Sequence, residues 1–290
     1  MTFYLNRIIL ILTLVHLNSC SSPSQSMLEK VRSLDLNSVE GNITTHYSPF
    51  YKDRAEYVHN LLLGSVNFFE TSFQVSRSFS IAVVDKPGWE KITGIPYGMP
   101  FVSGPPYIVC LPACSDNPLS ALVAEAIAGY GLGKRHGMAD GEIVDIFVSL
   151  IGFHELGHIY SREYGIRFPN KWTYEFAATY LAHFYLEENH PEESRIWADV
   201  SEILAKELGP QYTSLKDFEE KYLDVGVENY AWYQAVFLLR VLEVYTDQGA
   251  AFLEKMKACQ WPTASAPEFL NEMEDLAPGF MIWAGDHHLH

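Results

Sequence analysis

The spacing of hydrophobic residues changes along this chain near residue 119. Before that point, residues 50–72 place apolar side chains every three or four positions, which predicts an amphipathic helix. Residues 79–84 (FSIAVV) are instead a continuous run of apolar and β-branched side chains, which is typical of a buried strand. Glycine and proline separate two further extended segments, near residues 97–103 and 107–111. The first part of the chain is therefore predicted to contain a small sheet.

From residue 119 onward the apolar pattern is helical. Residues 142–164 form its longest run and predict a buried helix, and residues 172–188 predict a second helix that Asn189-His190-Pro191 ends. Further helices are expected at residues 192–207, 214–223, 229–247 and 249–258, with a short one near 267–275. A small sheet followed by a run of helices predicts the α+β class.

The first twenty residues resemble the export signal of a bacterial lipoprotein. Residues 8–15 (IILILTLV) form an apolar run after Arg7 that is too short for a permanent membrane span. Leu17-Asn18-Ser19-Cys20 then resembles a lipobox with Cys20 as the lipidated residue, which implies a signal peptide over residues 1–19. The expected location is the cell envelope outside the cytoplasm, as a periplasmic or outer-membrane lipoprotein. The alternative is a plain secretory signal with an incidental cysteine.

The rest of the chain is predicted to be one domain behind a tether. Residues 20–45 are expected to be the lipid anchor and tether, and residues 46–290 the domain. Its sheet-containing lobe is expected over about 46–165 and its helical lobe over about 166–290. The chain has 290 residues, 48% of them hydrophobic, which is enough for one sizeable core. Its net charge of −16 argues against nucleic acid and anionic membrane surfaces as main partners.

Three more cysteines follow Cys20, at Cys110, Cys114 and Cys259. In an oxidising compartment a local disulfide between Cys110 and Cys114 is one option. A zinc site at these two residues is disfavoured, because the chain has no matching pair of cysteines or histidines to complete it. Cys259 is then left as a free thiol.

The most specific motif is His154-Glu155-Leu156-Gly157-His158. Residues four apart lie on one face of a helix, so the imidazoles of His154 and His158 can share one metal ion. Glu155 lies about a hundred degrees round the helix, where it can reach a metal-bound water without ligating the metal. Apolar neighbours predict burial, which costs on the order of several kcal/mol for polar groups without partners. The alternative is two core histidines bonded to the backbone, with Glu155 in an ion pair.

A catalytic zinc ion needs a third protein ligand and an open fourth position. Glu175 is the candidate, with sixteen residues (159–174) between it and His158, on the next predicted helix and among apolar residues. The alternative is a glutamate near a helix start that the helix dipole stabilises. Glu163 lies on the wrong turn of the first helix, and His183 is expected to be a packed histidine.

These two segments together resemble the gluzincin metallopeptidases. The segment after the histidines, W-T-Y-E-F-A-A-T-Y, is similar to the W-x-x-E-G-F-A-x-Y element of the aminopeptidase-N-like branch, with Phe176 in place of the glycine; the matching residues are Trp172, Glu175, Ala178 and Tyr180. The resemblance implies a zincin-like architecture: a small mixed sheet with an edge strand over the cleft, the H-E-x-x-H helix, and a helical C-terminal lobe. It also implies a bound Zn²⁺, with Glu155 as general base and ligands His154, His158 and Glu175.

The chain departs from the family at two positions. The aminopeptidases bind the amino terminus of their substrate with a glutamate in a Gly-Ala-Met-Glu-Asn element, and the nearest segment here, Tyr97-Gly98-Met99-Pro100, has none. An endopeptidase is therefore favoured over an aminopeptidase. Thermolysin-like gluzincins orient a zinc-binding histidine with an aspartate four residues after the third ligand, and here Thr179 stands at that position.

The family also stabilises the oxyanion of the reaction with a tyrosine at the start of a later helix. Tyr230 and Tyr233 open such a helix three residues apart, so either is a candidate, and the alternative is that both are core aromatics. The resulting hypothesis is zinc-dependent hydrolysis of peptide bonds in a peptide or protein substrate. The competing hypothesis is a non-catalytic, zinc-stabilised binding lipoprotein. The sequence does not indicate which oligomeric state the protein adopts.

Overall fold

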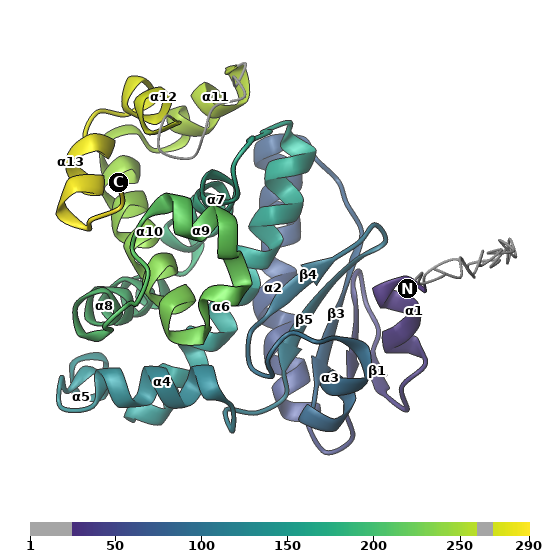
Figure 1. The fold of residues 1–290 in the computed structure, drawn as a ribbon. Coiled ribbons are helices and arrows are strands. Elements are labelled where there is room, and N and C mark those ends of the chain that lie inside the picture. Colours follow the sequence, from purple (N-terminus) through teal and green to yellow (C-terminus); the bar gives the residue numbers. More distant parts are fainter. Residues whose placement is uncertain (1–24, 260–268) are drawn as a thin grey trace, which may run out of the picture.

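A five-stranded sheet and a larger set of helices form the structure, which is a computed structural model that describes residues 25–259 and 269–290. In Figure 1 the sheet stands on the right, and helix α6 (Asp140–Tyr164) runs between it and the helices that follow α6 in the chain. The predicted signal peptide, residues 1–19, and the anchor at Cys20 lie outside the described residues. The α+β class is confirmed, and the fold is mostly helical.

The sheet is mixed, and its edge strands are short. The strands are β1 (Asn37–Val39), β2 (Thr44–Tyr47), β3 (Phe79–Val84), β4 (Phe101–Ser103) and β5 (Tyr107–Pro112). Their order in the sheet is β1-β2-β3-β5-β4. Strands β2, β3 and β5 are parallel, whereas β1 and β4 run antiparallel to their neighbours. Since β4 pairs with another strand on one side only, its other side offers backbone N–H and C=O groups.

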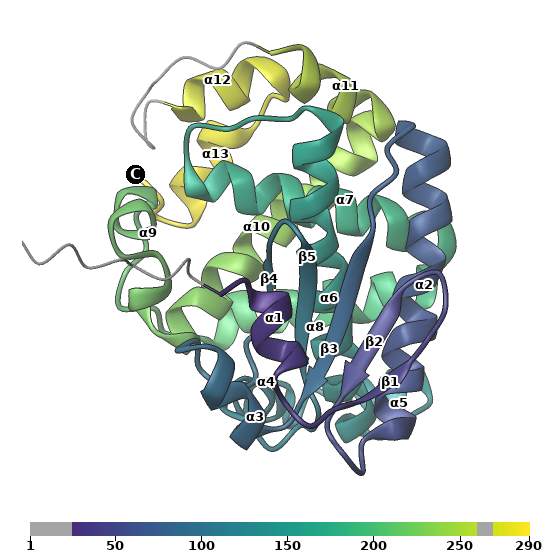
Figure 2. The ribbon, with the colours of Figure 1, turned by 90° about the vertical axis from the view of Figure 1, so that its right-hand side faces the viewer.

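Helices cover both faces of the sheet because the central strands are apolar on both faces. Figure 2 shows α1 (Met27–Arg32) and α3 (Lys86–Ile92) in front of the sheet, with α2 (Lys52–Phe73) and α6 behind it. Alternate residues of β3 face opposite ways: Ile81 belongs to the core shared with α2 and α6, and Ala82 to the core under α1 and α3.

The helical part follows the sheet in the chain. Its members are α4 (Pro118–Ile127), α5 (Leu132–His136), α6, α7 (Lys171–Asn189), α8 (Pro191–Glu207), α9 (Leu215–Lys221), the 3₁₀ helix η1 (Tyr222–Val225), α10 (Val227–Gln248), α11 (Ala250–Ala258), α12 (Phe269–Leu276) and α13 (Phe280–Asp286). The helices predicted from residue 142 onward are confirmed to within a few residues. The last helix, α13, was not predicted.

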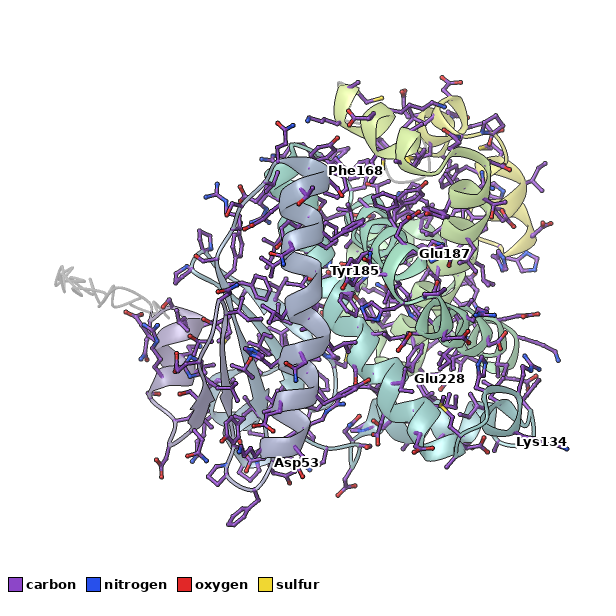
Figure 3. All side chains as sticks on the ribbon, turned by 180° about the vertical axis from the view of Figure 1, so that it is seen from behind. Asp53, Lys134, Phe168, Tyr185, Glu187 and Glu228 are labelled. Carbon is purple, nitrogen blue, oxygen red and sulfur yellow. The ribbon has the colours of Figure 1, made fainter. Side chains whose placement is uncertain are left out.

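Close packing of α6 on α7 brings the two halves of the predicted zinc site together. Gly157 allows it: a Cβ at this position would lie 2.2 Å from the carbonyl oxygen of Ala178. On the side of α2, a Cβ at Gly64 would lie 2.7 Å from the Tyr185 hydroxyl, and Figure 3 shows Tyr185 beside α2. Any larger residue at Gly157 would therefore push α7 away from the histidines.

Helix α6 is the one described helix with the length and apolar composition to cross a membrane. However, 83% of its most apolar window is buried inside the protein. The core helix of a globular domain meets the same two criteria, so this finding assigns no membrane span.

The ordered fold begins earlier than the predicted tether allows. Residues 20–45 were expected to be anchor and tether, yet α1, β1 and the start of β2 lie within this range. Strand β2 is polar and short, so its own pattern gives no strand signal; it is stabilised by the parallel ladder that pairs Thr45 with Ile81. Helix α1 begins with a capping box between Ser26 and Glu29.

The suggested disulfide is not present, because Cys110 and Cys114 are both free thiols. The side chain of Cys110 is fully buried in the core under α1 and α3. Cys114 follows strand β5, and its Sγ lies 3.5 Å from the hydroxyl of Tyr97. The two side chains are thus used in packing, and Cys259 is also free.

Candidate metal centre

Three buried side chains converge between α6 and α7. The ligand atoms that His154, His158 and Glu175 offer all lie within 4.8 Å of one another. Oε2 of Glu175 is 3.0 Å from Nε2 of His154 and 3.6 Å from Nε2 of His158. The two histidine rings are 4.7 Å apart and nearly perpendicular. Two imidazole nitrogens and a carboxylate oxygen in this arrangement can hold a metal ion.

The surroundings of Glu175 fit a metal better than an ordinary ion pair. Its side chain is fully buried, and no lysine or arginine of the described residues forms a salt bridge with it. Burial by itself raises the pKa of Glu175, but the charge of His158 and hydrogen bonds from both histidines outweigh it and hold the pKa well below its usual value. The carboxylate is therefore ionised and needs positive charge from the two histidines or from a cation they share.

Three neutral donors hold the Glu175 carboxylate in place. The hydroxyl of Tyr222, in η1, donates to Oε1 at 2.5 Å. On α10, the hydroxyl of Tyr230 donates to Oε2 at 3.1 Å, and the amide of Gln234 donates to the same oxygen at 2.9 Å. Burial raises the pKa of both tyrosines, and the negative charge of Glu175 raises it further, so both hydroxyls keep their protons as donors.

The second tyrosine candidate does not reach this centre. The hydroxyl of Tyr233 donates to the carbonyl oxygen of Ser214 at 2.7 Å, and its side chain is fully buried outside the cavity. Three residues are less than one full turn of a helix, so Tyr230 and Tyr233 point in different directions. Tyr230 points at the ligands and Tyr233 at α9. Of the two candidates, only Tyr230 lies at the site.

The two histidines are supported differently. Nδ1 of His154 lies 3.0 Å from the hydroxyl of Thr179, so the residue that replaces the family's aspartate makes the contact itself. His158 instead stacks on the ring of Tyr174 at 4.4 Å, and its buried Nδ1 has no hydrogen-bond partner within the described part of the chain. The Tyr174 hydroxyl donates to the carbonyl oxygen of His158 at 3.4 Å.

Glu155 lies beside the three ligands but in a different environment. Burial raises its pKa to about 8. The positive charge of His154 lowers this pKa, the negative charge of Glu175 raises it, and a hydrogen bond from the backbone N–H of Val102 lowers it. The contact with Val102 brings the edge strand β4 up to this carboxyl group. Glu155 is thus a buried acid–base group next to the ligands, facing the strand edge.

A cavity of about 400 Å³ opens onto these groups. Strand β4 and the loops around it form one wall, and helices α4, α6, α7, α8 and α10 with η1 form the others. The two other residues considered as ligands lie outside it. His183 is buried and shares a hydrogen bond with Ser194, and Glu163 forms a salt bridge with Arg77 at 2.6 Å.

The site therefore brings together most of the predicted residues and adds several others. Tyr222, Gln234 and Tyr174 had no sequence signal of their own, because their roles depend on how η1, α7 and α10 pack against α6. The tyrosine of the W-T-Y-E segment stands directly before Glu175, which is the one hint that sequence offered. Comparisons with protein-family models, with curated proteins and with solved structures found no match for this chain.

Proposed function

We propose that this protein is a zinc-dependent endopeptidase of the gluzincin type, which hydrolyses peptide bonds in a peptide or protein substrate. The observation that carries the proposal is the joint placement of a three-ligand set (His154, His158, Glu175) and a separate buried carboxyl group, Glu155, on one cavity. A structural metal site needs only the ligands. The extra acid–base group beside them is what hydrolysis requires.

The donor set favours zinc. Two imidazoles and one carboxylate, with a fourth position open to a cavity, are the ligands of a catalytic rather than a structural zinc ion. When bound, zinc would act as a Lewis acid on the scissile carbonyl and would acidify a water molecule. The fold supports the same reading: a mixed sheet with an antiparallel edge strand precedes the motif helix, and a helical lobe follows it, in the order that the resemblance implies.

Each remaining group has a part in the proposed reaction. Glu155 takes a proton from the attacking water and passes it to the leaving amine. The Tyr230 hydroxyl donates its one hydrogen to Oε2 of Glu175 in this structure, and it would turn from there to donate to the developing oxyanion. Tyr222 holds the other oxygen, Oε1, and thus orients the ligand. The free edge of β4 would pair with an extended peptide backbone and hold it across the cavity.

The competing function is a zinc-stabilised binding protein without turnover. The contact that favours it is Thr179, whose hydroxyl supports His154 where the family uses a carboxylate. Under both functions the lipobox-like segment at Cys20 would anchor the protein in the cell envelope.

Cleavage of an unfolded protein substrate separates these functions. The zinc-loaded chain should cleave reduced, denatured casein and a quenched-fluorescent peptide library, and a chelator should stop cleavage. Added zinc should restore it. Glu155→Gln should bind zinc but cleave nothing above background. A wild-type chain that holds zinc and cleaves no member of the library would favour the binding protein.

A further inference from the structure

The two ends of the cavity differ in chemistry. Toward the N-terminal end of α6 its walls are mostly apolar, with Ser201 as a polar residue among Leu119, Phe147, Ile151, Trp197 and Leu204 of α4, α6 and α8. Toward the C-terminal end of α6 the wall contains Arg162, beside Tyr107 and Tyr174. His154 and His158 lie between these ends on the same helix. Arg162 is the only lysine or arginine among the described residues that line the cavity.

Arg162 has no carboxylate partner within the described part of the chain. Its side chain donates to the hydroxyl of Tyr174 at 3.3 Å and also interacts with the hydroxyl of Tyr107. The neighbouring acid, Glu163, is engaged by Arg77 and by the hydroxyl of Tyr107.

Outside the cavity, four of the other seven described arginines form pairs with a carboxylate, whereas Arg32, Arg54 and Arg167 do not. The four pairs are Arg77 with Glu163, Arg135 with Asp199, Arg195 with Glu192, and Arg240 with Glu243. An arginine has five donors in a planar fork that suits a carboxylate. Arg162 is exposed where it lines the cavity, and its side-chain partners there are the hydroxyls of Tyr174 and Tyr107, so donors remain for a group from outside.

The position of Arg162 relates it to the bond that would be cleaved. His154, His158 and Arg162 follow one another at intervals of four residues, so they share one face of α6. One such interval is about 6 Å along the helix axis. An extended peptide advances about 3.3 Å per residue, so two residues cover that distance.

We propose that Arg162 binds a carboxylate of the substrate, one or two residues from the bond that is cleaved. The proposal rests on the proposed function for the identity of the substrate as a peptide, but carboxylate binding itself requires no turnover. Two sources carry this group: the side chain of a glutamate or aspartate, and the free carboxyl terminus of a peptide. The mostly apolar opposite end of the cavity leaves Arg162 as the group that distinguishes an acidic peptide from a neutral one.

Binding to the inactive, zinc-loaded Glu155→Gln chain tests the proposal without cleavage. The probes are capped, fluorescently labelled heptapeptides of alanine with one central phenylalanine, in which glutamate or glutamine is moved one position at a time. A further probe carries a free carboxyl terminus in place of the amide. Fluorescence anisotropy should show at least one glutamate position, or the free terminus, binding about tenfold more tightly than its neutral counterpart.

A second substitution in the Glu155→Gln chain shows which residue causes the preference for a carboxylate. Arg162→Gln should abolish it, and Arg162→Glu should turn it into a preference for lysine at the same position. Arg195→Gln, which removes a charge outside the cavity, should leave it unchanged. Tyr174→Phe removes the hydroxyl that contacts Arg162 but keeps the charge, so the preference should persist.

Several outcomes would overturn the proposal. These are equal binding of all glutamate, glutamine and free-terminus probes by the parent chain, or a preference that survives Arg162→Gln. Loss of zinc together with the preference in Arg162→Gln would show a structural role through Tyr174 instead. Whether Arg162 binds an acidic side chain or a free carboxyl terminus follows from which of the two kinds of probe binds more tightly. If the wild-type chain cleaves nothing but the preference and its loss are both observed, the proposed hydrolysis fails while carboxylate binding stands.

Discussion

Glu155 and Glu175 are two buried glutamates on one cavity, and their surroundings differ. Glu175, on α7, is held by Tyr222, Tyr230 and Gln234 and by both histidines, and its pKa lies well below the usual value. Glu155, on α6, is next to the edge strand, and burial raises its pKa to about 8. The pKa values differ because the charge of His158 and hydrogen bonds from the histidines outweigh burial at Glu175, whereas burial dominates at Glu155. Donors from η1 and α10 also contact Glu175.

This contrast explains how two identical side chains can have different roles. A carboxylate that several donors keep ionised is prepared to bind a cation. A carboxyl group that is buried with few donors exchanges its proton near neutral pH, as a general base must. Under the proposed function, α6, η1 and α10 together keep Glu175 ionised as the ligand, and burial between α6 and β4 sets the pKa of Glu155 as the base.

The largest expected effect comes from Glu155→Gln. With zinc bound, the amide cannot accept a proton, so kcat for peptide hydrolysis should fall by about 1,000-fold or more. The zinc content should stay unchanged, because Glu155 is not one of the three ligands. Steady-state kinetics with elemental analysis of the same sample checks both. If this variant loses zinc as well, Glu155 is a ligand and the contrast with Glu175 fails.

The next prediction concerns the pH dependence of folding in the zinc-free protein. The folded chain keeps the Glu155 proton up to about pH 8, whereas the unfolded chain releases it near 4.5. Stability from this group is therefore complete below pH 4.5 and is lost as pH rises through about 8. Glu155→Gln removes this loss, so the free energy of unfolding should favour the variant by on the order of a few kcal/mol at pH 9.

Urea denaturation in chelator between pH 5 and pH 9 measures this difference. The two stability curves should separate as pH rises. Parallel curves over this range would mean that the Glu155 carboxyl group has an ordinary pKa in the folded protein. Glu175 has the opposite sign, since its lowered pKa means that its contribution is lost as pH falls below 4.5.

Removing the hydroxyl of Tyr230 should cost less than removing the base. Tyr230→Phe should lower kcat about 100-fold, with little change in KM, because the hydroxyl acts mainly on the oxyanion. Tyr222→Phe is the matched variant, since Tyr222 contacts only the outer oxygen of the ligand, and it should lower zinc affinity more than kcat. The reverse pattern in these two variants would exchange the roles of the two tyrosines.

The smallest expected effect is at Thr179. Thr179→Val removes the hydroxyl that lies 3.0 Å from Nδ1 of His154, so zinc affinity should fall about tenfold. Thr179→Ser keeps the hydroxyl and serves as control. Competition with a fluorescent zinc chelator measures both variants. Equal affinities for wild type and Thr179→Val would show that the hydroxyl does not support the ligand.

Local patterns in the sequence predicted the parts of the site that depend on one helix. The spacing of His154 and His158 fixes their shared face, and the resemblance to gluzincins supplied Glu175 on the next helix. Both were brought together as expected because Gly157 lets α6 and α7 approach closely. The long helices were also predictable, since their apolar periodicity extends over many turns.

Features that depend on contacts between distant segments were not predictable. The donors Tyr222 and Gln234 reach Glu175 only because η1 and α10 fold back over α7. Strand β2, within the expected tether, exists through its ladder with β3 rather than through its own pattern. The choice between Tyr230 and Tyr233 depended on the rotation of α10, which spacing alone does not give.

The most direct test of the account is the zinc content of the purified chain. Elemental analysis should find about one zinc ion per wild-type chain, and less than about a tenth of that in His154→Ala and in Glu175→Ala. His183→Ala is the control, because His183 is a buried histidine of α7 that lies outside the site, and it should keep its zinc. Circular dichroism should show that all four proteins are folded. A wild-type chain without zinc, or a Glu175→Ala chain that binds it as well as wild type does, would contradict the three-ligand centre.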